Sequence, residues 1–234
     1  MEHKRLTLFA GHYGSGKTNI AVNYAIALAK EGKKVCIADL DIVNPYFRTK
    51  DSAKELALAG VDLVSPQFAN TNVDLPALPA EAYRLVTDKA TYGIMDIGGD
   101  DRGAYALGRY VPAIKEENNY RMVFVANCYR PLTRTPEEAL EVMQEIEAAC
   151  GLAFTDLVNN ANLGSETTAE TVLSSLEYMQ TLSAISGLPI FAHTAMTQVA
   201  EALAGKIEPV LPLQLQEKYF DLPSQKPGNR PLWG

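Results

Sequence analysis

The residues best suited to chemistry lie near the start of the chain, in the segment "GHYGSGKT" at positions 11–18. The segment fits the pattern G-x-x-x-x-G-K-[ST], with a predicted strand before it and a predicted helix after it. Glycines let the backbone curl so that successive N–H groups point at phosphate oxygens, and the start of the helix favours the same anion. We therefore predict that a nucleoside triphosphate is bound by Gly11, His12, Tyr13, Gly14, Ser15, Gly16, Lys17 and Thr18.

Aspartates follow this loop at the ends of predicted strands. Asp39 ends the second strand, and Asp96 ends the strand "YGIMD". Because ligands of a parallel sheet bind outside the carboxyl ends of its strands, both carboxylates should reach the phosphate edge. With the Thr18 hydroxyl they are predicted to bind Mg²⁺, directly or through water. Lys17 and Asp41 are the predicted catalytic residues, Asp41 orienting or deprotonating the attacking water. A turn or helix-cap role is the alternative for Asp39 and Asp41.

Predicted strands alternate with predicted helices along the chain. The strands cover 5–10, 34–39, 61–65, 92–96, 121–126, 156–159 and 189–193, and the helices cover 18–31, 52–59, 79–88, 104–117, 136–150, 168–183 and 197–204. Several strands are apolar on both faces, which predicts an α/β fold with a mostly parallel sheet covered by helices on both faces. We expect one P-loop domain at 1–205 and a proline-rich C-terminal tail at 206–234, packed on the domain or on a partner.

Composition limits the partners and the location. The net charge is −7, so binding to nucleic acid is not expected. The three cysteines are far apart in sequence and form no CxxC pair, which fits a reducing cytoplasm. No apolar run approaches the roughly 18 residues that a membrane span needs, so no membrane partner is expected.

The motifs resemble those of the ParA/MinD group of ATPases, which includes the CobQ/CobB-type domains. The resemblance is carried by "GHYGSGKT", "ADLDIVNPYFR", "MDIGGDD" and "VANCYRPLTRTPEEA", which occur in the order typical of that group. It implies a slow Mg-ATP-dependent switch with switch loops at 41–50 and 97–102, a homodimer, and a protein partner that the motifs do not name. One position departs from the group: His12 stands where a second lysine is usual.

The sequence leaves the base and the reaction open. The guanine-reading motif N-K-x-D is absent, and the amides of Asn159 or Asn160 suit the adenine edge, so ATP is predicted. The same asparagines could instead form a turn-and-cap segment. Two alternatives remain for the whole chain. One is a ligase similar to CobQ/CobB or dethiobiotin synthetase, with Tyr46, Phe47 and Arg48 lining a substrate pocket. The other is a GTPase similar to the metallochaperones.

Overall fold

The computed structural model describes residues 3–40, 49–65, 80–98 and 101–215. Its centre is a sheet with the strand order β3-β2-β4-β1-β5-β6-β7-β8, in which the described pairings are all parallel. The strands are β1 (Leu6–Ala10), β2 (Val35–Leu40), β3 (Val61–Val64), β4 (Tyr92–Ile97), β5 (Tyr120–Ala126), β6 (Asp156–Asn159), β7 (Ile190–Met196) and β8 (Val210–Leu213). The predicted α/β fold with a parallel sheet is confirmed.

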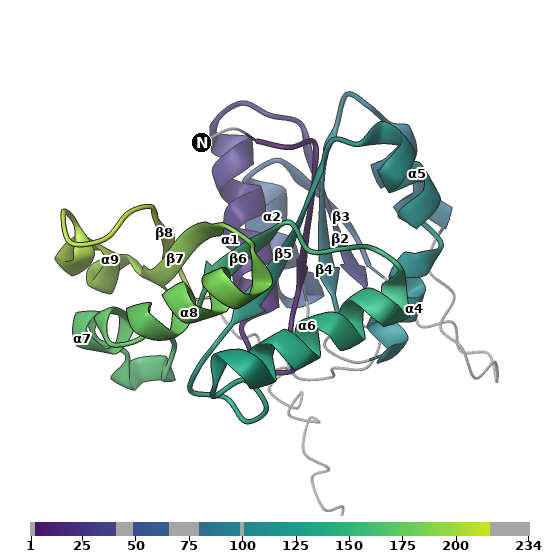
Figure 1. The fold of residues 1–234 in the computed structure, drawn as a ribbon. Coiled ribbons are helices and arrows are strands. Elements are labelled where there is room, and N and C mark those ends of the chain that lie inside the picture. The colour runs from purple at the N-terminus through teal and green to yellow at the C-terminus, as the bar shows by residue number, and fades with distance from the viewer. Residues whose placement is uncertain (1–2, 41–48, 66–79, 99–100, 216–234) are drawn as a thin grey trace, which may run out of the picture.

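Helices cover both faces of this sheet (Figure 1). One face carries α1 (Lys17–Lys30) and α2 (Ala53–Leu58). The other carries α3 (Arg84–Thr87), α4 (Asp101–Gly108), α5 (Val111–Glu117), α6 (Pro136–Cys150) and α8 (Leu176–Ser186). Two further helices, α7 (Ala169–Leu173) and α9 (Thr197–Leu203), pack on each other, and α9 also packs on β7 and β8.

Strand β1 shows why several strands have apolar residues on both faces. Leu6 and Leu8 belong to the core beneath α4–α6, whereas Phe9 belongs to the core beneath α1. All of them are fully buried, because successive side chains of a strand point to opposite faces and both faces are covered. The strand therefore ends deep in the protein and holds the segment that follows it in a fixed position.

The helix boundaries follow local capping chemistry. The Thr135 side chain accepts a hydrogen bond from the Glu138 N–H, and the Glu138 carboxylate accepts one from the Thr135 N–H, as the sequence predicted. The helical stretch expected at 104–117 is interrupted near Pro112, which lies in the first turn of α5, where a proline is tolerated. The single helix expected at 168–183 is two helices, α7 and α8.

The sheet extends beyond residue 205, where the sequence suggested an irregular tail. Strand β8 pairs with β7 over four positions, with Leu213 opposite Met196. The stretch is proline-rich and Pro212 lies within β8, but β8 is an edge strand of the described sheet and needs a complete set of N–H donors on one side only. The remaining tail residues, 216–234, lie outside the described residues.

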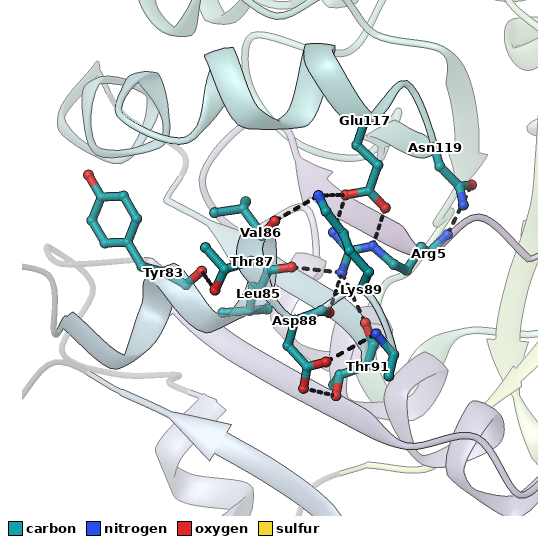
Figure 2. A network of polar contacts seen from close by, with 11 residues as sticks. Arg5, Tyr83, Leu85, Val86, Thr87, Asp88, Lys89, Thr91, Glu117 and Asn119 are labelled. Atoms are coloured by element: carbon teal, nitrogen blue, oxygen red, sulfur yellow. Dashed lines mark hydrogen bonds and ion pairs between the residues drawn. The ribbon is translucent and has the colours of Figure 1, made fainter.

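A network of hydrogen bonds and ion pairs lies at the edge of the sheet where β1 and β4 begin (Figure 2). The guanidinium of Arg5 donates to the carbonyls of Leu85 and Thr91, at 2.7 and 3.0 Å, and pairs with the Glu117 carboxylate. Lys89 donates to the same carboxylate at 2.7 Å. The side chains come from the segments just before β1 and β4 and from the end of α5. They therefore fasten the edge opposite the one where β1 ends and the glycine-rich segment begins.

Candidate functional site

The glycine-rich segment folds into a loop that only glycines fit easily. Gly14 and Gly16 have φ values of 74° and 94°, in the left-handed region that other residues rarely adopt. A Cβ on Gly11 would lie 2.7 Å from the Val125 carbonyl oxygen, so the loop rests directly on β5. The Ser15 N–H donates to the His12 carbonyl at 3.1 Å and closes the turn. With glycines at these positions, no side chain keeps a phosphate away from the backbone N–H groups of the loop, as a phosphate-binding loop requires.

Helix α1 starts from this loop without a side-chain cap. Gly16 is its N-cap residue, no side chain accepts from its first N–H groups, and its first turn holds no acid. Lys17 is 5% exposed, and its ammonium donates to the His12 carbonyl at 3.2 Å across the loop. The buried Ser15 hydroxyl has no hydrogen-bond partner among the described residues. These free donors and the lysine suit an anion at the start of the helix.

Oxygen ligands converge at the same edge of the sheet. Asp39 and Asp96 are direct neighbours in the register of β2 and β4, and both are buried. Thr18 is also buried, in the first turn of α1. A set made only of carboxylate and hydroxyl oxygens suits Mg²⁺, which prefers few protein oxygens and retains water. The residues present therefore fit the predicted metal ion.

Thr49 is a member of this site that the sequence did not indicate. Its hydroxyl donates to Asp96 Oδ2 at 3.0 Å, and its side chain is fully buried. Thr49 directly follows the 41–48 segment, so the contact links that segment to the end of β4. Thr49 is the first residue of a short 3-10 helix (Thr49–Ser52), and it carries no local signal of this role, since the partner is 47 residues away.

Asn159, the last residue of β6, and Asn160, which follows it, are both buried. Asn160 donates to the Ser15 carbonyl at 2.6 Å and accepts from the Thr194 hydroxyl at 2.7 Å, so both ends of its amide are engaged. Asn159 donates to the Ser175 hydroxyl at 2.8 Å, and its amide nitrogen lies 3.1 Å from His193 Nδ1. Asn160 thus braces the glycine-rich loop. Of the two asparagines, only Asn159 retains an amide oxygen without a hydrogen bond from the described residues.

His193 accepts from Asn159 in its neutral form. Burial lowers the pKa of His193, and no neighbouring charge contributes to that shift. A proton on Nδ1 would face the Asn159 amide N–H groups, so the neutral ring is the form that fits.

Several predicted site residues lie outside the described residues. These are Asp41, Tyr46, Phe47 and Arg48, together with most of the first predicted switch loop. Gly98, in the second predicted switch loop, lies against α4, since a Cβ on Gly103 of that helix would be 2.6 Å from the Gly98 Cα. His12 and Tyr13 are described and lie on the glycine-rich loop. His12 Nδ1 lies 3.0 Å from the Tyr13 carbonyl, and the Tyr13 side chain is 55% exposed.

A family model supports what this geometry indicates. The model of the CobQ/CobB/MinD/ParA nucleotide binding domain matches residues 6–172, which include the glycine-rich loop, Asp39, Asp96 and both asparagines. The chain belongs to this family. It is therefore a nucleotide-binding P-loop domain, and the match ends at the end of α7. A search among curated proteins found no match.

Solved structures share the fold at low identity. The chain is similar to cell division protein FtsY from Thermotoga maritima, with 19% identity, a TM-score of 0.51, and coverage of 79% of this chain and 59% of that one. FtsY from Mycoplasma mycoides has 15% identity and a TM-score of 0.51, and the match covers 81% of this chain and 58% of that one. The signal recognition particle 54 kDa protein from Aeropyrum pernix, in complex with GDP, has 17% identity and a TM-score of 0.50. The match covers 81% of this chain and 41% of that one. The CobQ/CobB/MinD/ParA domain described here thus spans less than two thirds of each of these chains.

No helix in the described ranges has both the length and the apolar character to cross a membrane. No group of three or more histidine, cysteine or acidic side chains is placed to hold a metal ion within the described part of the chain.

Proposed function

We propose that the protein binds Mg-ATP and hydrolyses it slowly to ADP and phosphate, using the nucleotide cycle as a switch. The observation that supports this most is the glycine-rich loop of a family nucleotide-binding domain, braced by Asn160 and followed by an uncapped helix. Lys17 and the Ser15 hydroxyl would bind phosphate oxygens. Thr18, Asp39 and Asp96 would hold Mg²⁺, which neutralises phosphate charge when bound.

Asp41 is the proposed water-positioning residue. It follows β2 by one residue, and β2 delivers Asp39 to the site. A carboxylate there would accept a proton from the attacking water or orient it. The Thr49 contact with Asp96 supports a switch, because it couples the segment after Asp41 to the predicted metal ligand.

ATP is the proposed nucleotide. The chain lacks an N-K-x-D motif. The free amide oxygen of Asn159 is an acceptor, so it suits the amino group of adenine better than the carbonyl of guanine. Because that oxygen is buried in this structure, the contact requires the residues that cover Asn159 to move. The similar structure with GDP makes GTP the competing ligand to test.

We also propose a homodimer that closes near the phosphate loop. Tyr13 on the loop and Leu132 after β5 are 55% and 62% exposed, so such an interface would bury their apolar surface. Light scattering with and without a non-hydrolysable ATP analogue tests this. A monomer under both conditions would contradict it.

Titration calorimetry and phosphate release test the central proposal. Lys17→Ala should weaken Mg-ATP binding about tenfold or more, since a charged hydrogen bond contributes about 1.5–3 kcal/mol. Lys30→Ala, at the exposed far end of the same helix, is the matched control and should bind normally. Asp41→Asn should bind Mg-ATP but release phosphate roughly 10²–10⁴-fold more slowly.

Three results would count against it. Unchanged affinity in Lys17→Ala would exclude a phosphate site at this loop. A clear preference for GTP would favour the GTPase alternative. Turnover only after a carboxylate substrate is added would favour the ligase.

A further inference from the structure

The loop between β5 and α6 places an arginine beside the phosphate loop. The Nε of Arg130 is 3.9 Å from the point where a Cβ on Gly14 would stand. Gly14 lies in the middle of the glycine-rich loop, and apart from Gly14 and its two chain neighbours no other heavy atom of the described residues comes within 4 Å of that point. Because Gly11 rests on the Val125 carbonyl, β5 carries its following loop directly to this place.

The backbone that carries Arg130 is tied down on both sides. Its N–H donates to the Asn127 carbonyl at 3.1 Å, and its carbonyl accepts from the Thr133 N–H at 3.3 Å. Asn127 Oδ1 accepts from the Tyr129 N–H at 3.0 Å, and the buried Thr133 hydroxyl donates to the Asn127 carbonyl at 2.9 Å. Asn127 is itself buried. These hydrogen bonds hold the backbone of Arg130 at a defined position in the loop.

Within the described part of the chain, no partner explains the placement of the Arg130 side chain. Among the described residues it makes no side-chain hydrogen bond and no ion pair, and it is exposed. Two arginines of the same fold that are less exposed have carboxylate partners: Arg5 pairs with Glu117, and Arg121 pairs with Asp156 at 3.2 Å. A guanidinium presents a planar fork of donors that matches phosphate oxygens and stays charged at any working pH.

We propose that Arg130 binds the phosphates of the nucleotide as a second cation beside Lys17. This inference rests on the proposed nucleotide-binding function and deepens it. Lys17 reaches the site from within the glycine-rich loop, whereas Arg130 reaches it from the outer side, next to Gly14. Two cations on different elements hold the polyphosphate from two sides. Position 12 supplies no lysine for this purpose, and His12 Nδ1 is directed at the Tyr13 carbonyl.

The test measures binding instead of turnover. Wild type, Arg130→Gln, Arg130→Lys and Lys17→Ala are titrated with Mg-ATP, with inorganic tripolyphosphate and with adenosine by calorimetry. Arg134→Gln is the matched control, because it removes the same charge from an exposed position of the same loop. Thermal unfolding without ligand checks that each variant is folded.

Arg130→Gln should weaken Mg-ATP and tripolyphosphate about ten- to one-hundred-fold and leave adenosine unchanged. Arg130→Lys should fall in between, since an ammonium retains the charge but loses the fork. Arg134→Gln should stay within about twofold of wild type.

The possible failures are distinct. If Lys17→Ala loses tripolyphosphate while Arg130→Gln binds it normally, the role of Arg130 is refuted and the phosphate site stands. Equal losses in Arg130→Gln and Arg134→Gln would also refute it, since they would reflect general charge. If wild type binds neither Mg-ATP nor tripolyphosphate, the proposed function and this inference fall together.

Discussion

Replacing Asn160 with alanine separates two roles for this residue. Its amide joins the Ser15 carbonyl, 145 residues away in sequence, to the Thr194 hydroxyl on β7, at 2.6 and 2.7 Å. The side chain is 2% exposed, so water cannot take over either bond. In this role Asn160 shapes the glycine-rich loop from behind. In the role that the sequence predicted, it would read the base.

The structure sets the expected size of the effect. Loss of the donor leaves a buried Ser15 carbonyl without this hydrogen bond, which costs about 1–3 kcal/mol. The second bond adds less, because the Thr194 hydroxyl also donates to the Asn159 carbonyl at 3.1 Å. A total of about 2–3 kcal/mol should lower the melting temperature by roughly 5–10 °C for a chain of this size.

Thermal unfolding without ligand and titrations with ATP, GTP and tripolyphosphate form the assay. Asn160→Ala should lose affinity for the three ligands by a similar factor, since the loop binds what they share. Thr194→Val removes the other partner and should cost about 1 kcal/mol. The double variant should cost less than the sum of the two, because both changes break one connected network. An unchanged melting temperature with an altered ATP-to-GTP ratio would refute the bracing role and restore base reading by Asn160.

Three further predictions concern other parts of the fold. The Arg5 guanidinium holds the pKa of Glu117 below its usual 4.5. The ionised Glu117 carboxylate therefore stabilises the fold fully above pH 4.5, and this stabilisation is lost as the pH falls through the folded-state pKa. Urea unfolding of Glu117→Gln should show a loss of about 2 kcal/mol at pH 7 that shrinks below pH 4.5; a pH-independent loss would contradict this. Gly16→Ala should abolish tripolyphosphate binding, because its Cβ would lie 2.2 Å from an amide nitrogen, whereas Gly32→Ala, strained but unobstructed, should bind normally. Thr49→Val should raise the Mg²⁺ concentration needed for nucleotide binding several-fold, as followed by calorimetry, and an unchanged requirement would exclude its role at the metal site.

Features that depend on local chemistry could be predicted from the sequence. The glycine-rich loop is one, because its left-handed turns need glycine at Gly14 and Gly16 whatever surrounds them. The start and end of α6 are another, because Thr135 and Gly151 act on backbone groups within four residues. The placement of Asp39 and Asp96 also followed, because apolar strands in parallel must end at one edge.

The functions of polar residues between the elements depend on the tertiary structure. The sequence showed two adjacent asparagines and an arginine, but a carboxamide can equally read a base, cap a helix or brace a loop. Only the pairing of β6 beside β5 and β7 brings Asn160 under Ser15, and only the loop after β5 brings Arg130 to Gly14. Strand β8 was missed for the same reason, since its proline, Pro212, is acceptable only at an edge. Sequence determines what each side chain can do, and the sheet order, which joins residues far apart in the chain, decides which partner is within reach.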